Sequence, residues 1–313
     1  QIDLDPKEKK FELEDLSAEI LNLDRREHEV AFRGNGRYVR RVHRVKSEDF
    51  PPRTQNAVQS DGTVLPYRLQ IDKPGILTNL SLNETTRREP GADEIEIQIK
   101  AGGINFRDVM KALGIYPGNP VDLKWFGDDF SGTVVKVGAN VQDLAVGDND
   151  VGMAHYSFIR YVTIPREMVF RKPDTMSHVE AATLPTVFLT SHYAINELAR
   201  MEKGESILIH AGTGGVGQAA IQIAKHLGLT IFSTAGTPEK RQLLRDMGVD
   251  HVLDSRTLEF ADEIMRITDG EGVDAVLNSL AGDFIPKNFS VLKTFGRYME
   301  IGKVDVYGNS KIG

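Results

Sequence analysis

The residues from Gly212 to Gly217 carry the clearest chemical signal in the sequence, because their spacing fits the pattern G-x-G-x-x-G. They directly follow the apolar run Ile207-Leu208-Ile209 and precede a helical segment that begins at Gln218. Glycines in such a strand-to-helix turn let the backbone approach a pyrophosphate, whose charge then meets the free N–H groups and the dipole of the helix. The pattern predicts a dinucleotide site; the alternative is an ordinary tight turn. The residues of the predicted site are Gly212, Thr213, Gly214, Gly215, Val216 and Gly217.

The end of the next predicted strand indicates which dinucleotide is bound. An NAD enzyme usually has an acidic residue there, about 20 positions beyond the glycines, to bind the ribose hydroxyls. The five residues from Ser233 and Thr234 to Thr237 include no acidic residue, and Lys240 and Arg241 follow them. Hydroxyl groups and cations favour the 2′-phosphate of NADPH over NADH. The alternative is that Lys240 and Arg241 only solvate the surface of a helix.

The elements that position this turn are predicted by residues 181–313, where strand and helix patterns alternate. Right-handed crossovers between such elements build a parallel sheet with helices on both faces, so we expect a Rossmann-type, doubly wound α/β domain. Gly228 and Gly248 each follow a helical pattern, as is typical of helix C-termini. The expected strands are 205–211, 230–235, 251–255, 274–280 and 297–302, and the expected helices are 215–228, 237–248, 258–270 and 283–292.

The sequence before this domain has a different pattern. Residues 63–180 contain short β-like runs separated by Gly, Pro and Asp turns, so we expect a β-rich domain there. Residues 1–62 are highly charged and form an N-terminal linker or structural segment. Within that segment, apolar residues alternate around Gly34-Asn35-Gly36, which predicts a hairpin, and the polar, proline-containing stretch 46–63 is typical of a linker.

Composition narrows the functional classes. A chain of 313 residues with 40% hydrophobic residues fits about two domains of roughly 150 residues. There are 38 Lys and Arg against 45 Asp and Glu, and the basic residues form no long tract, so nucleic acid is not an expected partner. No apolar run approaches the roughly 18 to 20 residues of a membrane span, and the charged N-terminus differs from a signal peptide. We therefore expect a soluble, cytoplasmic enzyme without a membrane partner.

The sequence offers poor ligands for a metal ion. It has no cysteine, so neither disulfides nor thiolate zinc ligands are possible. The eight histidines are scattered, and none has the spacing of a metal motif. Asp128 and Asp129 follow Trp125-Phe126-Gly127, but neither a thiolate nor a matching imidazole accompanies them. We expect no metal.

Five segments in the same order resemble the enoyl reductase domains of modular polyketide synthases and of animal fatty acid synthase. These are zinc-free members of the medium-chain dehydrogenase/reductase superfamily. The resemblance implies a GroES-like substrate domain, and hydride addition from NADPH to the β-carbon of an enoyl thioester carried on acyl carrier protein, followed by protonation of the α-carbon. It also implies neighbouring synthase domains as partners. The five segments are 101–118, 210–228, 236–264, 272–283 and 296–307.

The resemblance also implies roles for individual residues. Lys303 matches a lysine beside the nicotinamide that donates a proton or stabilises the enolate, with a surface lysine as the alternative. Tyr116 matches a tyrosine that delivers a proton to one face of the α-carbon, with a packed loop aromatic as the alternative. Asn105 matches a position near the nicotinamide and the substrate carbonyl, with a turn-stabilising asparagine as the alternative. Thr190 and Asn278 match contacts to the nicotinamide half of the cofactor.

Two features depart from this family. The sequence stops at Gly313, whereas family members continue past the fifth strand, so we expect the return of the chain to the substrate domain to be missing. Trp125 stands in a loop that is plainer in the family and is expected to reshape the substrate pocket. Three other functions stay open: a free-standing quinone or enone oxidoreductase, a reductase variant that diverts the enolate to ring closure, and a non-catalytic NADPH-binding module of a synthase.

Overall fold

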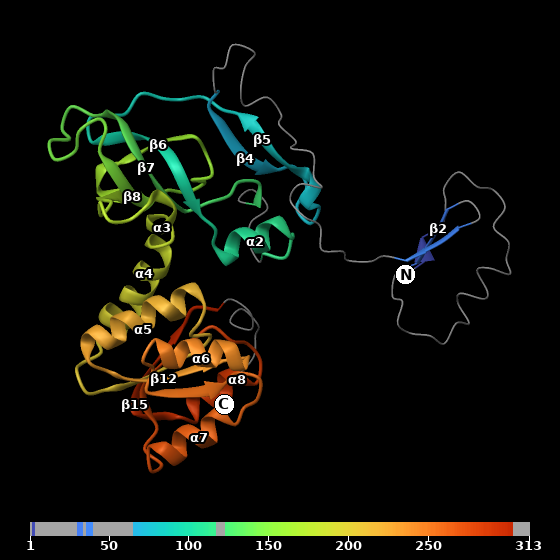
Figure 1. Ribbon diagram of the computed structural model, residues 1–313, viewed down its shortest axis with the longest axis vertical. Helices are drawn as coiled ribbons and strands as arrows, with labels where there is room; N and C mark the ends of the chain where they lie inside the picture. Colours follow the sequence, from blue (N-terminus) through green and yellow to red (C-terminus); the bar gives the residue numbers. More distant parts are fainter. Residues whose placement is uncertain (1, 4–29, 34–35, 40–64, 117–122, 303–313) are drawn as a thin grey trace. The chain divides into compact units, whose positions relative to one another are not determined.

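The computed structural model describes residues 2–3, 30–33, 36–39, 65–116 and 123–302 (Figure 1). The chain divides into two compact units, Gln1–Arg53 and Thr54–Gly313. In the first unit, β2 (Val30–Arg33) pairs antiparallel with β3 (Gly36–Val39), and β1 (Ile2–Asp3) pairs parallel with β2. The predicted hairpin is confirmed in its two strands, and the predicted linker 46–63 lies outside the described residues.

A five-stranded antiparallel sheet forms the centre of the predicted β-rich domain. Its order is β10-β8-β7-β6-β9, and β4 (Tyr67–Ile71) and β5 (Leu80–Glu84) form a separate two-stranded sheet. Ile95 and Ile97 of β6 are buried and pack with Phe130 and Val134 of β7. Residues two apart in a strand share a face, and Glu96 between them is also buried, where it pairs with Arg87. The strands of the larger sheet are β6 (Glu94–Gly103), β7 (Asp129–Val137), β8 (Asn149–Met153), β9 (Tyr161–Pro165) and β10 (Val169–Arg171).

A five-stranded parallel sheet forms the second domain, as predicted. Its order is β13-β12-β11-β14-β15, so the chain first builds outward on one side of β11 and then crosses to the other side at β14. The point between β11 and β14 is where the winding direction reverses, and ligands of such sheets bind beyond the carboxyl ends of the strands at that point. The strands are β11 (Ser206–Ile209), β12 (Thr230–Ala235), β13 (His251–Asp254), β14 (Val273–Asn278) and β15 (Leu292–Glu300).

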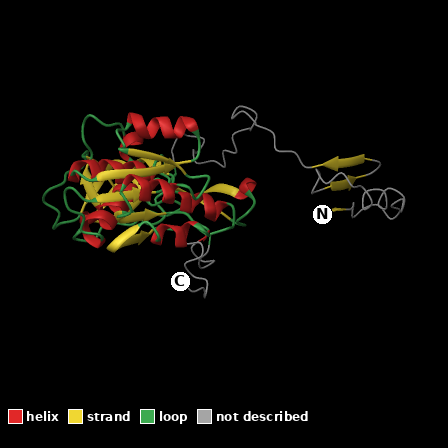
Figure 2. Ribbon diagram, turned by 90° about the horizontal axis from the view of Figure 1, so that it is seen from below, coloured by secondary structure: helices red, strands yellow, loops and turns green. Residues whose placement is uncertain are grey.

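Helices cover both faces of this sheet (red in Figure 2). The side chains of Ile207 and Ile209 point to one face and pack with α5 and α6, whereas Leu208 points to the other face and packs with α7. A strand that is buried on both faces reads as a continuous apolar run, and β11 has that sequence. The helices are α5 (Gly215–Leu227), α6 (Pro238–Asp246), α7 (Phe260–Ile267) and α8 (Phe284–Phe289).

The glycines that end α5 and α6 match the sequence prediction, whereas α7 and α8 end three residues earlier than predicted and the last strand starts earlier than predicted. Gly228 and Gly248 both have φ +74, the left-handed conformation in which glycine ends a helix. Strand β15 begins at Leu292, five residues before the predicted start. Its partner register jumps between Leu292 and Arg297, so residues 293–296 form a bulge that carries no strand pattern in the sequence.

A helical segment connects the two domains of the second unit. It comprises α3 (His178–Ala181), α4 (Pro185–His192) and the π-helix η5 (Tyr193–Leu198). Helix α3 contacts β6 and β7, and α4 contacts β7, β8 and α5. This segment therefore links the β-rich domain to the helix that follows the glycine turn (yellow-green in Figure 1).

Candidate functional site

The glycine turn between β11 and α5 is built from close backbone contacts. Gly212 is buried, and a Cβ there would lie 2.0 Å from the hydroxyl oxygen of Ser233. Gly217 is also buried, and a Cβ there would lie 2.5 Å from the carbonyl oxygen of Ala211. Gly214 is exposed at the helix N-cap, and a Cβ there would meet only that carbonyl oxygen, at 3.2 Å. Gly212 and Gly217 therefore allow close packing within the turn, and Gly214 leaves the outer side of the turn open.

The N-terminus of α5 has no side-chain cap. By contrast, the Ser177 hydroxyl accepts an N–H bond at the start of α3, and the Thr237 hydroxyl does so at the start of α6. In the described part of the chain, no hydrogen bond accounts for the N–H groups of Gly215, Val216 and Gly217. Free N–H groups at the positive end of a helix dipole bind phosphate. These residues fit the diphosphate of a dinucleotide.

Helix α4 packs against the first turn of α5. The buried Ser191 hydroxyl donates to the carbonyl oxygens of Val187, at 2.7 Å, and of Val216, at 3.1 Å. A Cβ on Gly215 would lie 2.9 Å from a methyl carbon of Val187, so this glycine permits the helix contact. Thr190 is half-buried and directly precedes Ser191. The structure therefore places Thr190 on a helix that adjoins the glycine turn.

The two hydroxyl residues predicted at the end of β12 are fully buried. The Ser233 hydroxyl donates to the carbonyl oxygen of Ile209 at 2.9 Å, and the Thr234 hydroxyl lies 2.9 Å from Nδ1 of His210. Both hydroxyls thus have partners inside the domain, because β12 lies between two other strands and its side chains pack under the helices. In these positions Ser233 and Thr234 support the glycine turn from the core, and we do not place them at a 2′-phosphate.

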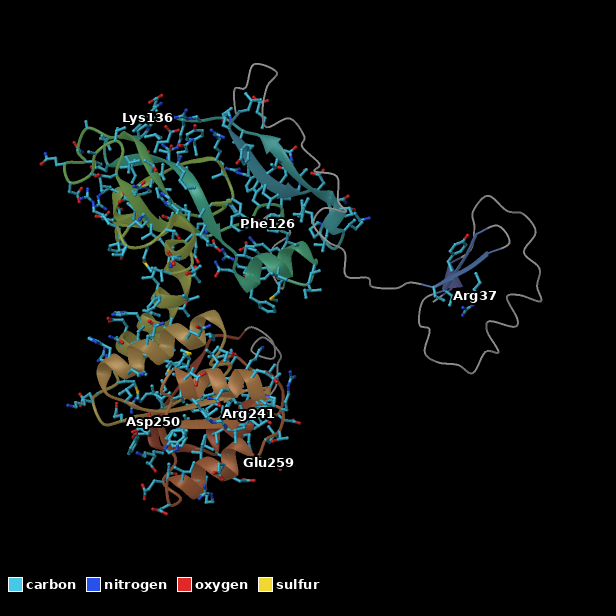
Figure 3. All side chains as sticks on the ribbon, in the orientation of Figure 1. Arg37, Phe126, Lys136, Arg241, Asp250 and Glu259 are labelled. Carbon is cyan, nitrogen blue, oxygen red and sulfur yellow. The ribbon has the colours of Figure 1, made fainter. Side chains whose placement is uncertain are left out.

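Cationic side chains surround the carboxyl end of β12. Arg241, labelled in Figure 3, donates to the carbonyl oxygen of Ala235 at 3.2 Å and to the Asp254 carboxylate at 2.8 Å. Lys240 beside it is exposed. Arg256, which sequence reasoning missed, is also exposed, and its Nε would lie 2.6 Å from a Cβ on Gly236. The only sequence signal for Arg256 was a glycine at the position that it approaches.

Asn105 is held in a polar network that joins α2 (Phe106–Ala112) to β7 and α4. Its side-chain amide donates to the Asp129 carboxylate at 3.1 Å, and its backbone N–H donates to Asp108 at 3.0 Å. The other Asp129 oxygen accepts from the N–H of Thr186 at 3.0 Å and from its hydroxyl at 2.6 Å. Burial raises the pKa of Asp129. Asn105 is the N-cap residue of α2, and its side-chain amide has a second hydrogen that these contacts do not use.

The Asn278 side chain is fully buried at the end of β14. Its amide nitrogen donates to Leu280 O at 2.7 Å and to the Glu300 carboxylate at 2.6 Å, and its amide oxygen accepts from Leu280 N at 3.1 Å and from Asn288 at 3.0 Å. All of its hydrogen-bonding capacity is therefore used within the domain. Asn278 orders the strand ends rather than presenting its amide to a ligand.

Of the two other predicted catalytic residues, Tyr116 lies within the described part of the chain and Lys303 does not. Tyr116 is half-buried after α2, and its phenol interacts electrostatically with the Lys111 ammonium, whose pKa is lowered mainly by burial. Lys303 lies outside the described residues, and it directly follows Gly302 in the sequence.

Among the described residues, no group of three or more His, Asp and Glu side chains is arranged to hold a metal ion. None of the helices in the described ranges is long and apolar enough to cross a membrane.

Two family models match the chain. The alcohol dehydrogenase GroES-like domain matches residues 91–174, and the zinc-binding dehydrogenase domain matches residues 215–312. The chain is 40% identical over its whole length to phthioceranic/hydroxyphthioceranic acid synthase of Mycobacterium tuberculosis, of which it spans 14%. It is also 43% identical over 78% of its length to a highly reducing polyketide synthase of Gibberella zeae, of which it spans 10%.

Several solved structures are similar to this chain in both fold and sequence. The CurK enoyl reductase superimposes with a TM-score of 0.74 at 43% identity, covering 78% of this chain and 76% of that one. The CurF ER cyclopropanase of the curacin A pathway has a TM-score of 0.71 at 39% identity, with coverages of 78% and 76%. A mycobacterial protein solved in complex with NADPH has a TM-score of 0.68 at 29% identity, with coverages of 76% and 74%.

Proposed function

We propose that this chain reduces the α,β double bond of an enoyl thioester with NADPH, because it belongs to the enoyl reductases of polyketide synthases, in the medium-chain dehydrogenase/reductase superfamily. The observation that carries the proposal is the uncapped N-terminus of α5 behind a glycine turn, beside the strand where the sheet reverses its winding. NADPH, when bound, supplies the hydride that the β-carbon receives. The protein binds and orients both reactants.

The proposed cofactor site follows the carboxyl edge of the sheet. The turn from Gly212 to Gly217, including Thr213, Gly214, Gly215 and Val216, faces the diphosphate with the N–H groups of α5. Lys240 and Arg256 bind the 2′-phosphate, while Arg241 contributes less because Asp254 already pairs with it. This charge distribution supports NADPH rather than NADH. Thr190 contacts the nicotinamide half from α4.

The proposed reacting centre needs donors around the thioester oxygen, because negative charge develops there as the hydride arrives. Asn105 meets this need with its second amide hydrogen, and Asp129 and Thr186 fix the orientation of that amide. Lys303 donates a proton or stabilises the enolate, and Tyr116 delivers a proton to one face of the α-carbon. The natural substrate is carried on acyl carrier protein, and neighbouring synthase domains supply it, because the matched relatives are synthases several times longer than this chain.

A turnover assay tests this function. With NADPH and a crotonyl thioester on acyl carrier protein, we expect NADPH consumption and a saturated thioester, because the thioester carbonyl activates the β-carbon for hydride addition. A quinone or a small free enone should react more slowly. Faster reduction of the quinone would favour a free-standing oxidoreductase, and NADPH binding without turnover of any acceptor would favour a non-catalytic module.

A second candidate function is ring closure of the enolate. The observation in its favour is the 39% identity to a structure described as a cyclopropanase. Reduction adds a hydride and a proton to the substrate, whereas ring closure adds a hydride and loses a leaving group at a neighbouring carbon. The mass of the product formed from a substrate that carries such a leaving group therefore separates the two.

Replacing Arg256 with alanine should weaken NADPH binding about tenfold, because a charge-assisted hydrogen bond to phosphate contributes about 1.5 to 3 kcal/mol and exposure reduces that value. Binding of NADH, which lacks the 2′-phosphate, should stay within twofold. Fluorescence titration with both cofactors measures the effect. Arg266→Ala is the matched control, because Arg266 is an exposed arginine paired with Glu263 on α7. An equal loss of affinity for NADPH and NADH would contradict the assignment.

A further inference from the structure

A line of polar side chains crosses the carboxyl edge of the parallel sheet from one strand end to the next. It begins in β12 and runs through the residue after β11, then α8 and β14, to β15, and every neighbouring pair lies within hydrogen-bond distance. Four of its members are at most 3% exposed. Burying polar side chains stabilises a fold only where each one is bonded, so this line is an ordered network. Its members are Thr234, His210, Asn288, Asn278, Glu300 and Tyr298.

One backbone contact fixes the orientation of both asparagine side chains in this network. The N–H of Leu280 can only donate, so the Asn278 side-chain atom that it meets at 3.1 Å is the oxygen. Asn288 must then present its amide nitrogen to that oxygen, and its own oxygen faces Nε2 of His210 at 2.7 Å. Burial lowers the pKa of His210 to about 4, so the imidazole is neutral, with its hydrogen on Nε2. Nδ1 then accepts from the hydroxyl of Thr234, 2.9 Å away.

The donors converge on the carboxylate of Glu300. One oxygen accepts from the amide of Asn278 at 2.6 Å and from the Tyr298 hydroxyl at 2.7 Å. The other accepts from the backbone N–H of Gly302 at 2.6 Å. Burial, together with the hydrogen-bonded Glu300 carboxylate, raises the pKa of Tyr298, so its hydroxyl stays protonated and donates. A carboxylate has no hydrogen of its own, and here it accepts from all three groups at once.

The network fixes the backbone in two places beyond the strand ends. Asn278 bonds both the N–H and the carbonyl of Leu280, in the loop that follows β14. Glu300 bonds Gly302, in the segment that follows β15. Both places lie at the edge where ligands of such a sheet bind, and on the β14 side of the winding reversal. None of the mechanistic roles given above uses Glu300, Tyr298 or Asn288.

We propose that Glu300 is a positioning residue, which holds the segments after β14 and β15 in the arrangement that the nicotinamide and the enoyl group require. This inference rests on the proposed reductase function. Glu300 touches no reactant: it acts through the backbone at Gly302 and through Asn278. Hydride transfer is sensitive to such positioning, because a displacement of about 1 Å can lower a rate about a hundredfold.

Glu300→Gln tests the proposal. The glutamine keeps the shape of the side chain, but its amide group puts a donor where the carboxylate now accepts, so at least one of the three bonds is lost. We expect the single-turnover rate of hydride transfer, at saturating NADPH and enoyl thioester, to fall tenfold or more. The dissociation constant of NADPH should stay within threefold, because the glycine turn and the cations at β12 are unchanged. A decrease in rate at unchanged cofactor affinity is not expected from a merely structural role.

Two further variants keep the test decisive. Glu205→Gln is the matched control, because Glu205 accepts comparable bonds from Arg297 and from the N–H of Glu202 at the opposite, amino edge of the sheet. It should leave hydride transfer unchanged. Tyr298→Phe removes one donor and leaves the other two in place, so it should lower the rate by twofold to fivefold, and it decides the matter if Glu300→Gln fails to fold.

Different results would refute the reductase function and the positioning role of Glu300. An unmodified protein that binds NADPH but reduces no enoyl thioester would refute the proposed function. An active unmodified protein whose Glu300→Gln and Tyr298→Phe variants transfer hydride at the normal rate would overturn the positioning role alone. An equal fall of rate and NADPH affinity would also overturn it, because the network would then serve cofactor binding in general.

Discussion

Replacing Gly214 with aspartate should weaken NADPH binding at least a hundredfold while the fold stays intact. A Cβ at this position would meet only the Ala211 carbonyl oxygen, at 3.2 Å, and the backbone angles φ −76 and ψ 169 suit any residue. The aspartate side chain would instead place a negative charge at the uncapped N-terminus of α5. Two like charges about 4 Å apart at an effective dielectric constant near 20 repel by about 4 kcal/mol. Fluorescence titration with NADPH and circular dichroism measure the two quantities.

Two other glycine variants separate charge from shape. Gly214→Ala adds only a methyl group to the same open position and should change NADPH affinity much less than aspartate does. Gly217→Ala adds a methyl group 2.5 Å from the carbonyl of Ala211, so it should lower the melting temperature instead. If Gly214→Asp bound NADPH normally, the diphosphate would not lie at this helix end.

Replacing Asp150 with asparagine should stabilise the protein by about 2 to 3 kcal/mol at pH 8, a value that follows from about 1.4 kcal/mol per pKa unit. The Asp150 side chain in β8 is 0% exposed, and neither carboxylate oxygen has a hydrogen-bond partner. Burial, together with the neighbouring Asp148, raises its pKa from 3.8 to about 6. The folded state therefore favours the protonated form, and ionisation above the folded pKa destabilises it.

The sign of this effect gives the experiment an internal control. Because the folded pKa exceeds the unfolded value, the destabilisation by Asp150 is absent below pH 3.8, grows as the pH rises toward 6 and is complete above pH 6. The gain from Asp150→Asn should thus disappear near pH 4. His210 has the opposite linkage, since its lowered pKa removes stability as the pH falls from 6.5 toward 4, but it is present in both proteins and cancels. Urea unfolding at pH 4 and pH 8 measures the difference, and equal stability at pH 8 would mean that the carboxylate is solvated.

The architecture could be predicted from the sequence because its signals are local. The apolar run before Gly212, the amphipathic helices and the glycines after them report on contacts within about ten residues of each other along the chain. The parallel order of the strands then follows from right-handed crossovers. The bulge at the start of β15 gave no such signal, because residues 293–296 owe their conformation to the partner strand β14.

The candidate site was only partly predictable, because its side chains depend on contacts between distant segments. Ser233 and Thr234 have the right chemistry for a phosphate, yet their central strand buries them. Asn278 is at the predicted edge but bonds to Glu300 and Asn288 rather than facing outward. Arg256 belongs to no sequence motif that indicates a phosphate site, and it lies beside Gly236 only because β13 is next to β12. The roles given to Lys303, Tyr116 and Asn105 stay predictions.

Transfer of deuterium from NADPH that carries deuterium at both C4 positions of the nicotinamide tests the central claim most directly. After reaction with a crotonyl thioester on acyl carrier protein, mass spectrometry of the product should show a saturated acyl chain that carries one deuterium at its β-carbon. An unlabelled product, or an enoyl thioester that is recovered unchanged while NADPH remains bound and reduced, would contradict the assignment of this chain as a reductase.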